Sequence, residues 1–198
     1  MDLRLARHGE TEWNVQKWIQ GGTDIPLNEN GVQQAGQLAD RLLAEGFRPA
    51  RVYASPMRRA LDTARIVSDA LQAECIPSPG LEEINFGLWE GLTWDQVQER
   101  YPADFRQWYG NRRYQRPPQG ESYQDLLERM LPVLSEIVQR EGGPDASCHV
   151  LVVAHSASVM SLLSWMHDTP FSEMVSRYRT QNGQTVMLDA QRFLPPFT

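Results

Sequence analysis

Residues 3–14 are LRLARHGETEWN, a short apolar segment followed by an Arg-His-Gly sequence and a polar stretch. The apolar segment predicts a β-strand that ends before His8, and Gly9 favours a turn after it. Two later segments have the same plan, because residues 51–55 are RVYAS and residues 149–156 are HVLVVAHS. We therefore expect three short strands, each with a polar side chain directly after its carboxyl end.

Strand-like and helix-like segments alternate along the whole chain, which is typical of the α/β class. We predict a three-layer sandwich, in which a mostly parallel central sheet is flanked by helices on both faces. Apolar periodicity predicts helices over residues 31–45, 55–73, 93–100, 122–140 and 156–166, and a late strand over 185–188. Asn28, Ser55 and Ser122 are the expected N-caps of three of these helices.

The predicted domain organisation is a single domain over residues 1–198. It carries a lid-like insertion at about 92–121. Within this insertion, residues 102–121 are PADFRQWYGNRRYQRPPQGE, aromatic and basic and interrupted by Pro and Gly. This composition predicts an irregular loop rather than core structure.

The composition narrows the possible partners and location. The chain has 198 residues, a net charge of -6 and a mean hydropathy of -0.49. Its acidic balance argues against nucleic acid or an anionic membrane as a partner. No apolar run approaches the ~20 residues that a membrane-spanning helix needs. The first residues lack a basic-then-apolar signal pattern, so we expect a cytoplasmic protein.

Cysteine and histidine usage predicts neither a metal nor a cofactor. Cys75 and Cys148 are too few for a disulfide framework or a zinc cluster, and we expect free, buried thiols. The four histidines show no HExxH pattern. The sequence also has no GxxxxGK[ST] loop and no GxSxG elbow, which argues against P-loop and α/β-hydrolase chemistry.

The three strand ends are expected to form one crevice, because ligands of open α/β sheets bind at the carboxyl ends of parallel strands. Two histidines, His8 and His155, and the nearby arginines Arg7 and Arg59 would then converge. A single histidine at a strand end is more often structural, whereas two at matching positions favour a functional site.

Arg58 and Arg59 fall in the first turn of a predicted helix, where the positive end of the helix dipole disfavours each cation by roughly 0.3–1 kcal/mol. A bound anion would turn this arrangement into a phosphate site. Alternatively, Asp62 neutralises the pair from one turn further along the helix. This segment alone leaves both interpretations open.

Several motifs in order resemble those of the histidine phosphatase superfamily, on its phosphoglycerate-mutase-like branch. They are RHGETEWN at 7–14, LNENG at 27–31, SPMRRA with TA at 55–60 and 63–64, LEEI with GLWEG at 81–84 and 87–91, and VVAH at 152–155. Ser156 and Ala157 follow the second histidine, where many relatives have Gly. We therefore expect the local turn and the shape of the pocket to differ from theirs.

The resemblance implies phosphoryl transfer through a phosphohistidine, with His8 as the nucleophile. It implies a phosphate pocket made of Arg7, Arg59 and His155, and it makes Glu83 the general acid and base, with Glu82 as the adjacent alternative. Further binding residues are expected at Asn14, Gln20, Gly21, Thr23 and Ser156. Arg58 is expected to be peripheral.

The sequence therefore predicts a phosphoric monoester hydrolase of the histidine acid phosphatase type, which acts on a small phosphorylated metabolite as a monomer or homodimer. One alternative is a cofactor-dependent phosphoglycerate mutase, since such enzymes place an arginine pair like Arg112-Arg113 on the substrate carboxylate. The segment from Glu83 to His155 is shorter than in most mutases, which favours the phosphatase. A third reading, a non-catalytic phosphate-binding protein, predicts loss of His8 or Glu83.

The substrate preference is expected to come from residues outside the motifs. Candidates to line the mouth of the site are Trp13, Trp18, Trp108, Tyr109, Arg112 and Arg113. For the aromatic residues among them, packing in the core is the competing interpretation.

Overall fold

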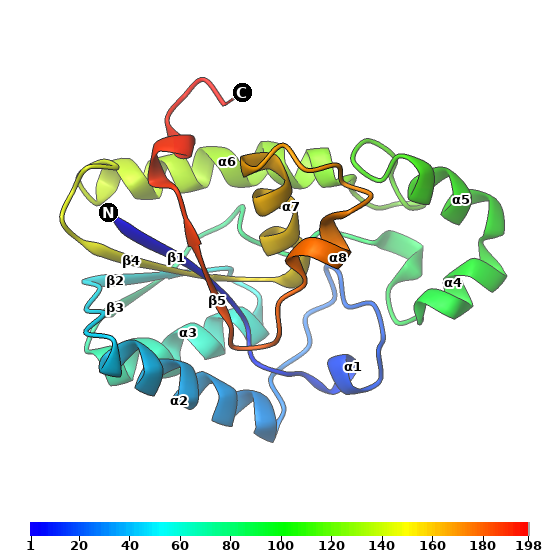
Figure 1. The fold of residues 1–198 in the computed structure, drawn as a ribbon. Coiled ribbons are helices and arrows are strands. Elements are labelled where there is room, and N and C mark those ends of the chain that lie inside the picture. Colours follow the sequence, from blue (N-terminus) through cyan, green and yellow to red (C-terminus); the bar gives the residue numbers. More distant parts are fainter. Residues whose placement is uncertain (198) are drawn as a thin grey trace.

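The computed structural model describes residues 1–197, and its centre is a five-stranded β-sheet (Figure 1). The strands are β1 (Asp2–Arg7), β2 (Arg51–Ala54), β3 (Glu74–Pro77), β4 (His149–Ala154) and β5 (Thr185–Leu188). They lie in the order β3-β2-β4-β1-β5. The first four are parallel to one another, and β5 pairs antiparallel with β1 at the edge. This confirms the predicted mostly parallel sheet.

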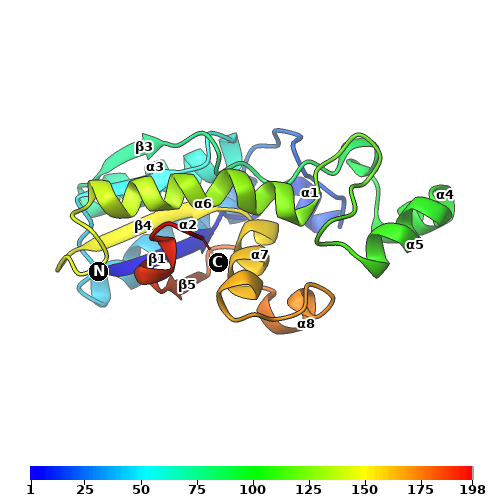
Figure 2. The same cartoon turned by 90° about the horizontal axis from the view of Figure 1, so that it is seen from above.

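Helices cover both faces of the sheet, which confirms the three-layer arrangement. They are α1 (Glu12–Val15), α2 (Glu29–Ala44), α3 (Arg58–Leu71), α4 (Trp94–Arg100), α5 (Pro102–Gly110), α6 (Tyr123–Arg140), α7 (Ser156–Met166) and α8 (Met174–Tyr178), with short 3-10 turns η1 (Gly87–Trp89) and η2 (Ala190–Phe193). In Figure 1, α2 and α3 lie below the sheet, and α6 and α7 lie above it. Both Figure 1 and Figure 2 show α4 and α5 extending beyond one end of the sheet.

The buried core lies on both sides of the sheet. Residues 150–154 of β4 are fully buried, because helices pack on both faces of this central strand. In β1 the side chains alternate between the two faces. Leu5 joins the cluster under α6 and α7, and Ala6 joins the cluster over α2 and α3.

Two predicted helix caps are confirmed. The Asn28 side chain accepts a hydrogen bond from Gly31 N at 2.8 Å and begins α2. Ser122 and Asp125 form a reciprocal capping box at the start of α6. These short polar side chains fix where the helices start, so the helix boundaries follow the sequence closely.

The predicted start of the third helix is wrong by a few residues. Ser55 does not cap α3, which begins at Arg58 with Met57 at the N-cap position. Asp24 fills the capping role from a distant loop, since its Oδ1 accepts from Arg58 N at 2.8 Å. Ser55 instead stays in line with the end of β2, and its hydroxyl contacts His155.

The segment 102–121 is also more ordered than predicted, because its first half forms α5. Pro102 occupies the first turn of this helix, where its missing N–H removes no hydrogen bond. Strand β3 was not predicted at all. It is only four residues long, it lies at the sheet edge, and its side chains are half-buried or exposed, so no apolar alternation marks it.

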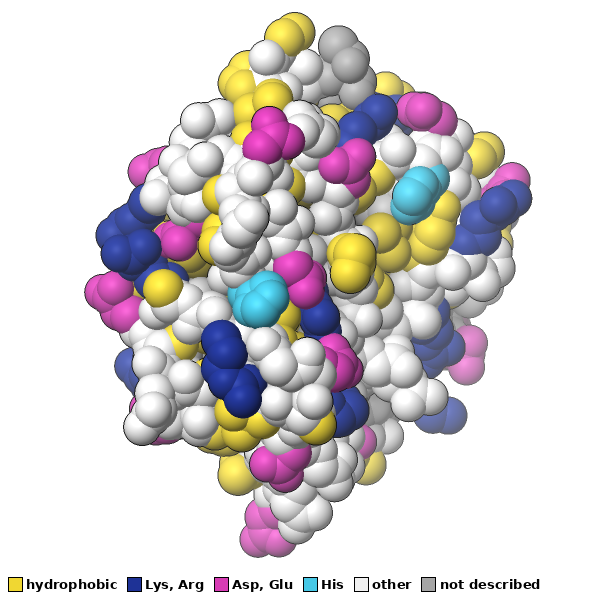
Figure 3. All heavy atoms as spheres, turned by 60° about the vertical axis from the view of Figure 1, so that its left-hand side comes forward, with side chains coloured by type: hydrophobic (Ala, Val, Ile, Leu, Met, Phe, Trp, Pro, Cys, Tyr) yellow, Lys and Arg dark blue, Asp and Glu magenta, His cyan; other side chains and the backbone are white. Residues whose placement is uncertain are grey.

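The surface carries both signs of charge. Figure 3 shows acidic and basic side chains interspersed over the face it presents. Among residues 1–197, no helix has the length and apolar character needed to cross a membrane. Cys75 and Cys148 are both free thiols and are only partly buried.

Candidate active site

The carboxyl ends of three neighbouring parallel strands, β2, β4 and β1, bring Ser55, His155 and His8 together. The parallel register aligns the last residues of β1 and β4 and offsets the last residue of β2 by one position. The ring centroids of His8 and His155 are 5.2 Å apart. Ser55 lies within hydrogen-bond distance of His155, at 2.8 Å from Oγ to Nε2.

His8 is held as a neutral ring with one nitrogen unengaged. Its Nδ1 lies 2.6 Å from Gly9 O, a carbonyl that can only accept, so Nδ1 carries the proton and Nε2 keeps its lone pair. Burial, followed by the charges of Arg59 and Arg7, lowers the pKa of His8 well below its usual value. A Cβ on Gly9 would lie 2.3 Å from Gly31 O, so this position requires glycine.

His155 is also buried and neutral. Burial is the largest cause that lowers the pKa of its ring, with Arg59 and His8 acting in the same direction. The hydroxyl oxygen of Ser55 accepts from Met57 N at 3.3 Å, so its own proton can go to His155 Nε2. His155 Nδ1 is buried and has no hydrogen-bond partner among residues 1–197. That nitrogen is therefore available as a neutral donor.

Two arginines flank the histidines and are held by backbone carbonyls. Arg59, which has no exposed surface, donates to Thr23 O at 2.8 Å and to Gly21 O at 2.9 Å. Arg7 donates to Thr180 O at 2.6 Å. These carbonyls fix the direction of both guanidinium groups.

Neither Arg7 nor Arg59 forms an ion pair within residues 1–197, and the Nε atom of each is buried without a partner. Burial lowers the pKa of Arg7 to about 10 and also lowers that of Arg59. A buried cation without a counterion is unfavourable. The arrangement is therefore suited to an anion placed between the two guanidinium groups.

Glu83 faces the same space from the loop before η1. Its Oε2 accepts from Ala157 N at the start of α7, at 3.2 Å, and its Oε1 accepts from Ile84 N at 3.1 Å. Burial raises the pKa of Glu83, while Arg59 opposes this shift. Such a carboxyl can hold a proton at a higher pH than an exposed one.

Glu82, the adjacent alternative, points elsewhere. Its Oε2 accepts from Gly80 N at 2.6 Å and lies 3.8 Å from Arg129 Nη1. A cavity of about 430 Å³ is lined by both glutamates together with Asp24 and Met57. This cavity gives solvent and ligands a path to the Glu83 carboxyl.

The predicted binding residues have different roles in the geometry. Asn14 lies on α1, and its Oδ1 accepts from Thr11 N at 3.0 Å. Gly21 and Thr23 contact Arg59 through their carbonyls, as described above, so they position a cation rather than present a side chain. Gln20 Oε1 is buried without a partner among residues 1–197. Ser156 is the first residue of α7.

The structure also separates the two interpretations of the arginine pair. Asp62 pairs with Arg65 at 3.2 Å and with neither Arg58 nor Arg59. Arg58 is exposed, as expected for a peripheral residue, whereas Arg59 is fully buried. The interpretation in which Asp62 neutralises the pair is therefore wrong.

The candidate mouth residues fall into a core group and a second group, residues 109–114 at the end of α5, which we call the α5 rim. Trp108 is buried and stacks on Trp94, with centroids 5.2 Å apart, so the core interpretation holds for it. Trp13 and Trp18 pack edge to face. Tyr109 is 56% exposed and covers the Arg112 guanidinium at 4.6 Å.

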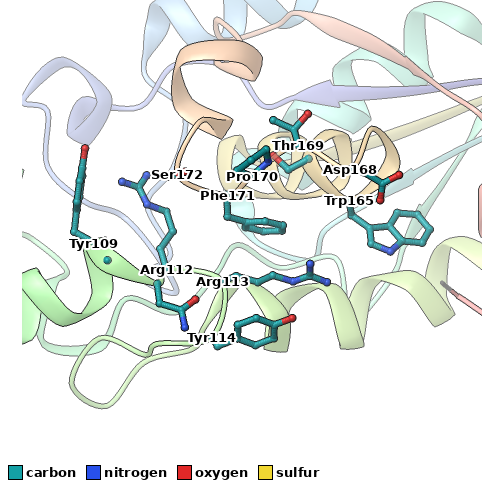
Figure 4. A pocket seen from close by; sticks show the side chains of 13 residues that line it. Tyr109, Arg112, Arg113, Tyr114, Trp165, Asp168, Thr169, Pro170, Phe171 and Ser172 are labelled. Atoms are coloured by element: carbon teal, nitrogen blue, oxygen red, sulfur yellow. The ribbon is translucent and has the colours of Figure 1, made fainter.

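A second cavity, of about 490 Å³, lies between the end of α5 and the segment after α7 (Figure 4). Arg112 and Arg113 both line it, but Figure 4 shows their side chains extending in different directions. Arg113 lies between the rings of Phe171 and Tyr114. Arg112 is only 6% exposed and forms no ion pair within residues 1–197.

Sequence reasoning placed Ser55 at a strand end of the site but predicted that it caps a helix, and it missed Thr63 and Asn182 as site residues. Thr63 Oγ1 accepts from Gly9 N at 3.0 Å, and Asn182 Nδ2 donates to His8 O at 2.9 Å. Asn182 precedes a glycine, which marks a turn, but nothing in the sequence indicates its contact with a residue 174 positions away. Among residues 1–197, no group of three or more His, Cys, Asp or Glu side chains is arranged to hold a metal ion.

Comparison with known families gives one match over most of the chain. The model of the histidine phosphatase superfamily (branch 1) matches residues 3–193. The chain is 34% identical over 172 residues to 6-phosphofructo-2-kinase/fructose-2,6-bisphosphatase from Gallus gallus, and it is equally similar to the enzyme of this name from Caenorhabditis elegans. The match covers 87% of this chain and about a third of each relative. The chain thus spans only part of these longer proteins.

Solved structures with the same fold include several phosphatases. A mycobacterial glucosyl-3-phosphoglycerate phosphatase in complex with VO3 superposes with a TM-score of 0.82 at 29% identity, covering 94% of this chain and 90% of the other. A phosphoserine phosphatase from Entamoeba histolytica, in complex with 3-phosphoglyceric acid, gives a TM-score of 0.79 at 26% identity, with 94% and 89% covered. Several relatives of this chain are therefore phosphatases.

Proposed function

Since the chain belongs to branch 1 of the histidine phosphatase superfamily, we propose that it hydrolyses small phosphomonoesters through a phosphorylated His8. The observation that carries this proposal is the setting of His8. A neutral buried imidazole with an unengaged Nε2 lies near the partly buried Arg7 and the fully buried Arg59, neither of which forms an ion pair within residues 1–197. A phosphoryl group supplies the missing negative charge and the electrophile in one ligand.

In the first step, His8 Nε2 attacks phosphorus and the bond from phosphorus to the leaving oxygen breaks. Arg7, Arg59 and the Nδ1–H of His155 balance the charge on the three other phosphate oxygens. Glu83 gives its proton to the leaving alkoxide. Its raised pKa supports this role, because the carboxyl must be protonated when the substrate binds.

In the second step, water attacks the phosphohistidine. Glu83, now ionised, takes the proton of the water, the phosphorus–nitrogen bond breaks, and inorganic phosphate leaves. His8 returns to its neutral form, and Gly9 O retains the Nδ1 proton throughout. The two steps return every group to its starting state, so the reaction needs no further reactant.

Trapping the intermediate tests this proposal. The protein is mixed with ³²P-labelled phosphomonoester, quenched within milliseconds, and digested for mass spectrometry. We expect an acid-labile, base-stable phosphoryl group on His8. Steady turnover with label that never appears on His8 would contradict the mechanism.

A second candidate function, the cofactor-dependent phosphoglycerate mutase, is favoured by Arg112. This arginine is 6% exposed, packs against Trp108 and Tyr109, and lacks an ionic partner in the described chain. A carboxylate or second phosphate on the substrate would meet this cation. Under this hypothesis, residues 92–121 cover the bound substrate, and the phosphoryl group returns to it instead of to water. Assays of phosphate release and of 2- and 3-phosphoglycerate interconversion, run on the same sample, distinguish the two functions.

A further inference from the structure

The loop of residues 180–184, between α8 and β5, is bonded directly to the end of β1. Arg7 N donates to Gln184 O at 3.0 Å, and Gly183 N donates to Arg7 O at 3.0 Å. These two backbone bonds extend the antiparallel pairing of β1 and β5 beyond its last strand pair, and the Arg7 side chain also donates to Thr180 O. They place the Asn182 side chain beside His8.

The Asn182 amide makes two contacts at the site. Its Nδ2 donates to His8 O at 2.9 Å and lies 3.3 Å from Asn14 Oδ1. An amide nitrogen carries two hydrogens, so both bonds form at the same time. One side chain therefore connects the backbone of the proposed nucleophile to a proposed phosphate ligand.

The peptide unit between His8 and Gly9 is held at both of its polar atoms. Asn182 binds the carbonyl of His8 from one side, and Thr63 Oγ1 accepts from Gly9 N at 3.0 Å from the other. Thr63 is fully buried, and its own proton goes to Arg59 O at 2.7 Å. The Nδ1 proton of His8 goes to Gly9 O, the carbonyl of the next peptide. The His8–Gly9 peptide therefore sets the position of the residue from which this carbonyl projects toward the ring.

Asn14 is oriented by the same contact. Its Oδ1 accepts from Thr11 N at 3.0 Å, from Thr11 Oγ1 at 3.2 Å and from Asn182. Three donors on this oxygen exclude the flipped amide. Asn14 Nδ2 has no hydrogen bond to residues 1–197, so it remains a donor for a ligand.

We infer that Asn182 is a positioning residue for the reaction at His8. It holds the His8–Gly9 peptide so that Nε2 faces the phosphorus atom, and it keeps the Asn14 amide with its donors toward the phosphate. This inference rests on the proposed function. It assigns Asn182 an effect mainly on the rate of phosphoryl transfer and a smaller one on the affinity for phosphate, because only the Asn14 donor depends on Asn182 whereas both arginines are held by backbone carbonyls.

Two variants test the inference, Asn182→Ala and the similarly sized Asn182→Leu. Gln181→Ala is the matched control, since Gln181 is an exposed neighbour in the same loop whose side chain makes no hydrogen bond within residues 1–197. The measurements are kcat and KM for p-nitrophenyl phosphate, the rate of the phosphohistidine burst, the inhibition constant of inorganic phosphate, and the unfolding midpoint.

For both Asn182 variants we expect kcat and the burst rate to fall about 10- to 100-fold, as for a reacting group displaced by about 1 Å. The phosphate inhibition constant and the unfolding midpoint should stay close to those of Gln181→Ala. Unchanged kcat in both variants overturns the inference. A parallel loss of phosphate affinity and thermal stability also overturns it, because that pattern marks a merely structural residue.

A spectroscopic measurement keeps this inference separate from the proposed function. The ¹⁵N shifts of His8 report which ring nitrogen carries the proton. We expect the Nδ1–H form in the protein as described and a mixture of tautomers in Asn182→Ala. If neither the parent protein nor Gln181→Ala releases phosphate, the proposed function fails. The tautomer shift then still decides whether Asn182 orients the ring, and unchanged ¹⁵N shifts overturn that orientation.

Discussion

The strand-end part of the site and the α5 rim differ in what holds their arginines. Arg7 and Arg59 are oriented by three backbone carbonyls from two separate loops, and neither forms an ion pair within residues 1–197. Arg112 and Arg113, by contrast, pack on aromatic rings, and Arg113 also donates to Gln124 Oε1 at 3.0 Å. Carbonyl-bound guanidinium groups point in fixed directions, whereas stacking permits more movement. Under the proposed function, the strand ends would hold the reacting group in a fixed position, and the rim would contact the rest of the substrate.

Replacement of His8 should have the largest effect. We expect His8→Ala to lower kcat/KM for p-nitrophenyl phosphate at least about 1,000-fold, because the variant lacks the attacking nitrogen. His167→Ala removes an exposed histidine at the end of α7 and serves as the control. If His8→Ala kept its turnover, the reaction would not take place at the strand ends.

Removal of the Arg59 cation should have the second largest effect on the strand-end region. Arg59→Met keeps most of the buried volume but removes the cation, so kcat/KM should fall about 100- to 1,000-fold. Inorganic phosphate should raise the unfolding midpoint of the parent protein and of Arg58→Met, but not that of Arg59→Met, because only Arg59 is buried at the site. Equal phosphate stabilisation in all three proteins would show that the anion binds elsewhere.

Much of this region could be predicted from the sequence, and the reason is local. A strand, a histidine and a glycine occur within a few residues, and the parallel order of the strands then brings distant copies of this plan together. Ser55 was misjudged, because a serine before a proline resembles a helix cap in isolation. Its contact with His155 depends on a strand neighbour 100 residues away. Asn182 and Thr63 escaped prediction for the same physical reason.

The rim was harder to predict. The aromatic and Pro-broken composition predicts an irregular loop, yet Pro102 starts α5, Trp108 lies in the core and Phe105 packs against it. The ring of Trp108, on α5, packs against the rings of Trp89 and Trp94. We infer that this packing stabilises the helix over the loop that the sequence predicts. Such packing is a tertiary property that no short window of sequence reveals.

Glu83 lies between the two regions, and its replacement should have an effect that depends on the leaving group. In Glu83→Gln we expect alkyl phosphates to react about 100-fold or more slowly, and p-nitrophenyl phosphate to lose less than about 10-fold, because nitrophenolate leaves without a proton. Glu82→Gln is the matched control. Equal losses on both substrates would argue against a general acid at this position.

The same carboxyl determines a pH dependence. Burial raises the pKa of Glu83, so kcat/KM for an alkyl phosphate should fall as pH rises through that pKa, and Glu83→Gln should lack this fall. The free energy of unfolding should also decrease as pH rises. Between the unfolded pKa near 4.3 and the higher folded pKa, the folded chain binds the extra proton, so stability decreases as pH rises. Denaturant unfolding of both proteins across this window measures the difference.

The smallest effect is expected at the rim. Tyr109 is 56% exposed, and its ring over Arg112 contributes about 0.5–1 kcal/mol, as for other exposed cation–π pairs. Tyr109→Ala should therefore change KM about 2- to 5-fold for a substrate with a second anionic group and leave kcat for p-nitrophenyl phosphate nearly unchanged. Tyr114→Ala, which removes a ring next to Arg113 instead, is the control. A loss in kcat as large as that of Arg59→Met would mean that the rim takes part in phosphoryl transfer. The distinction between a fixed reaction centre and an adaptable mouth would then no longer hold.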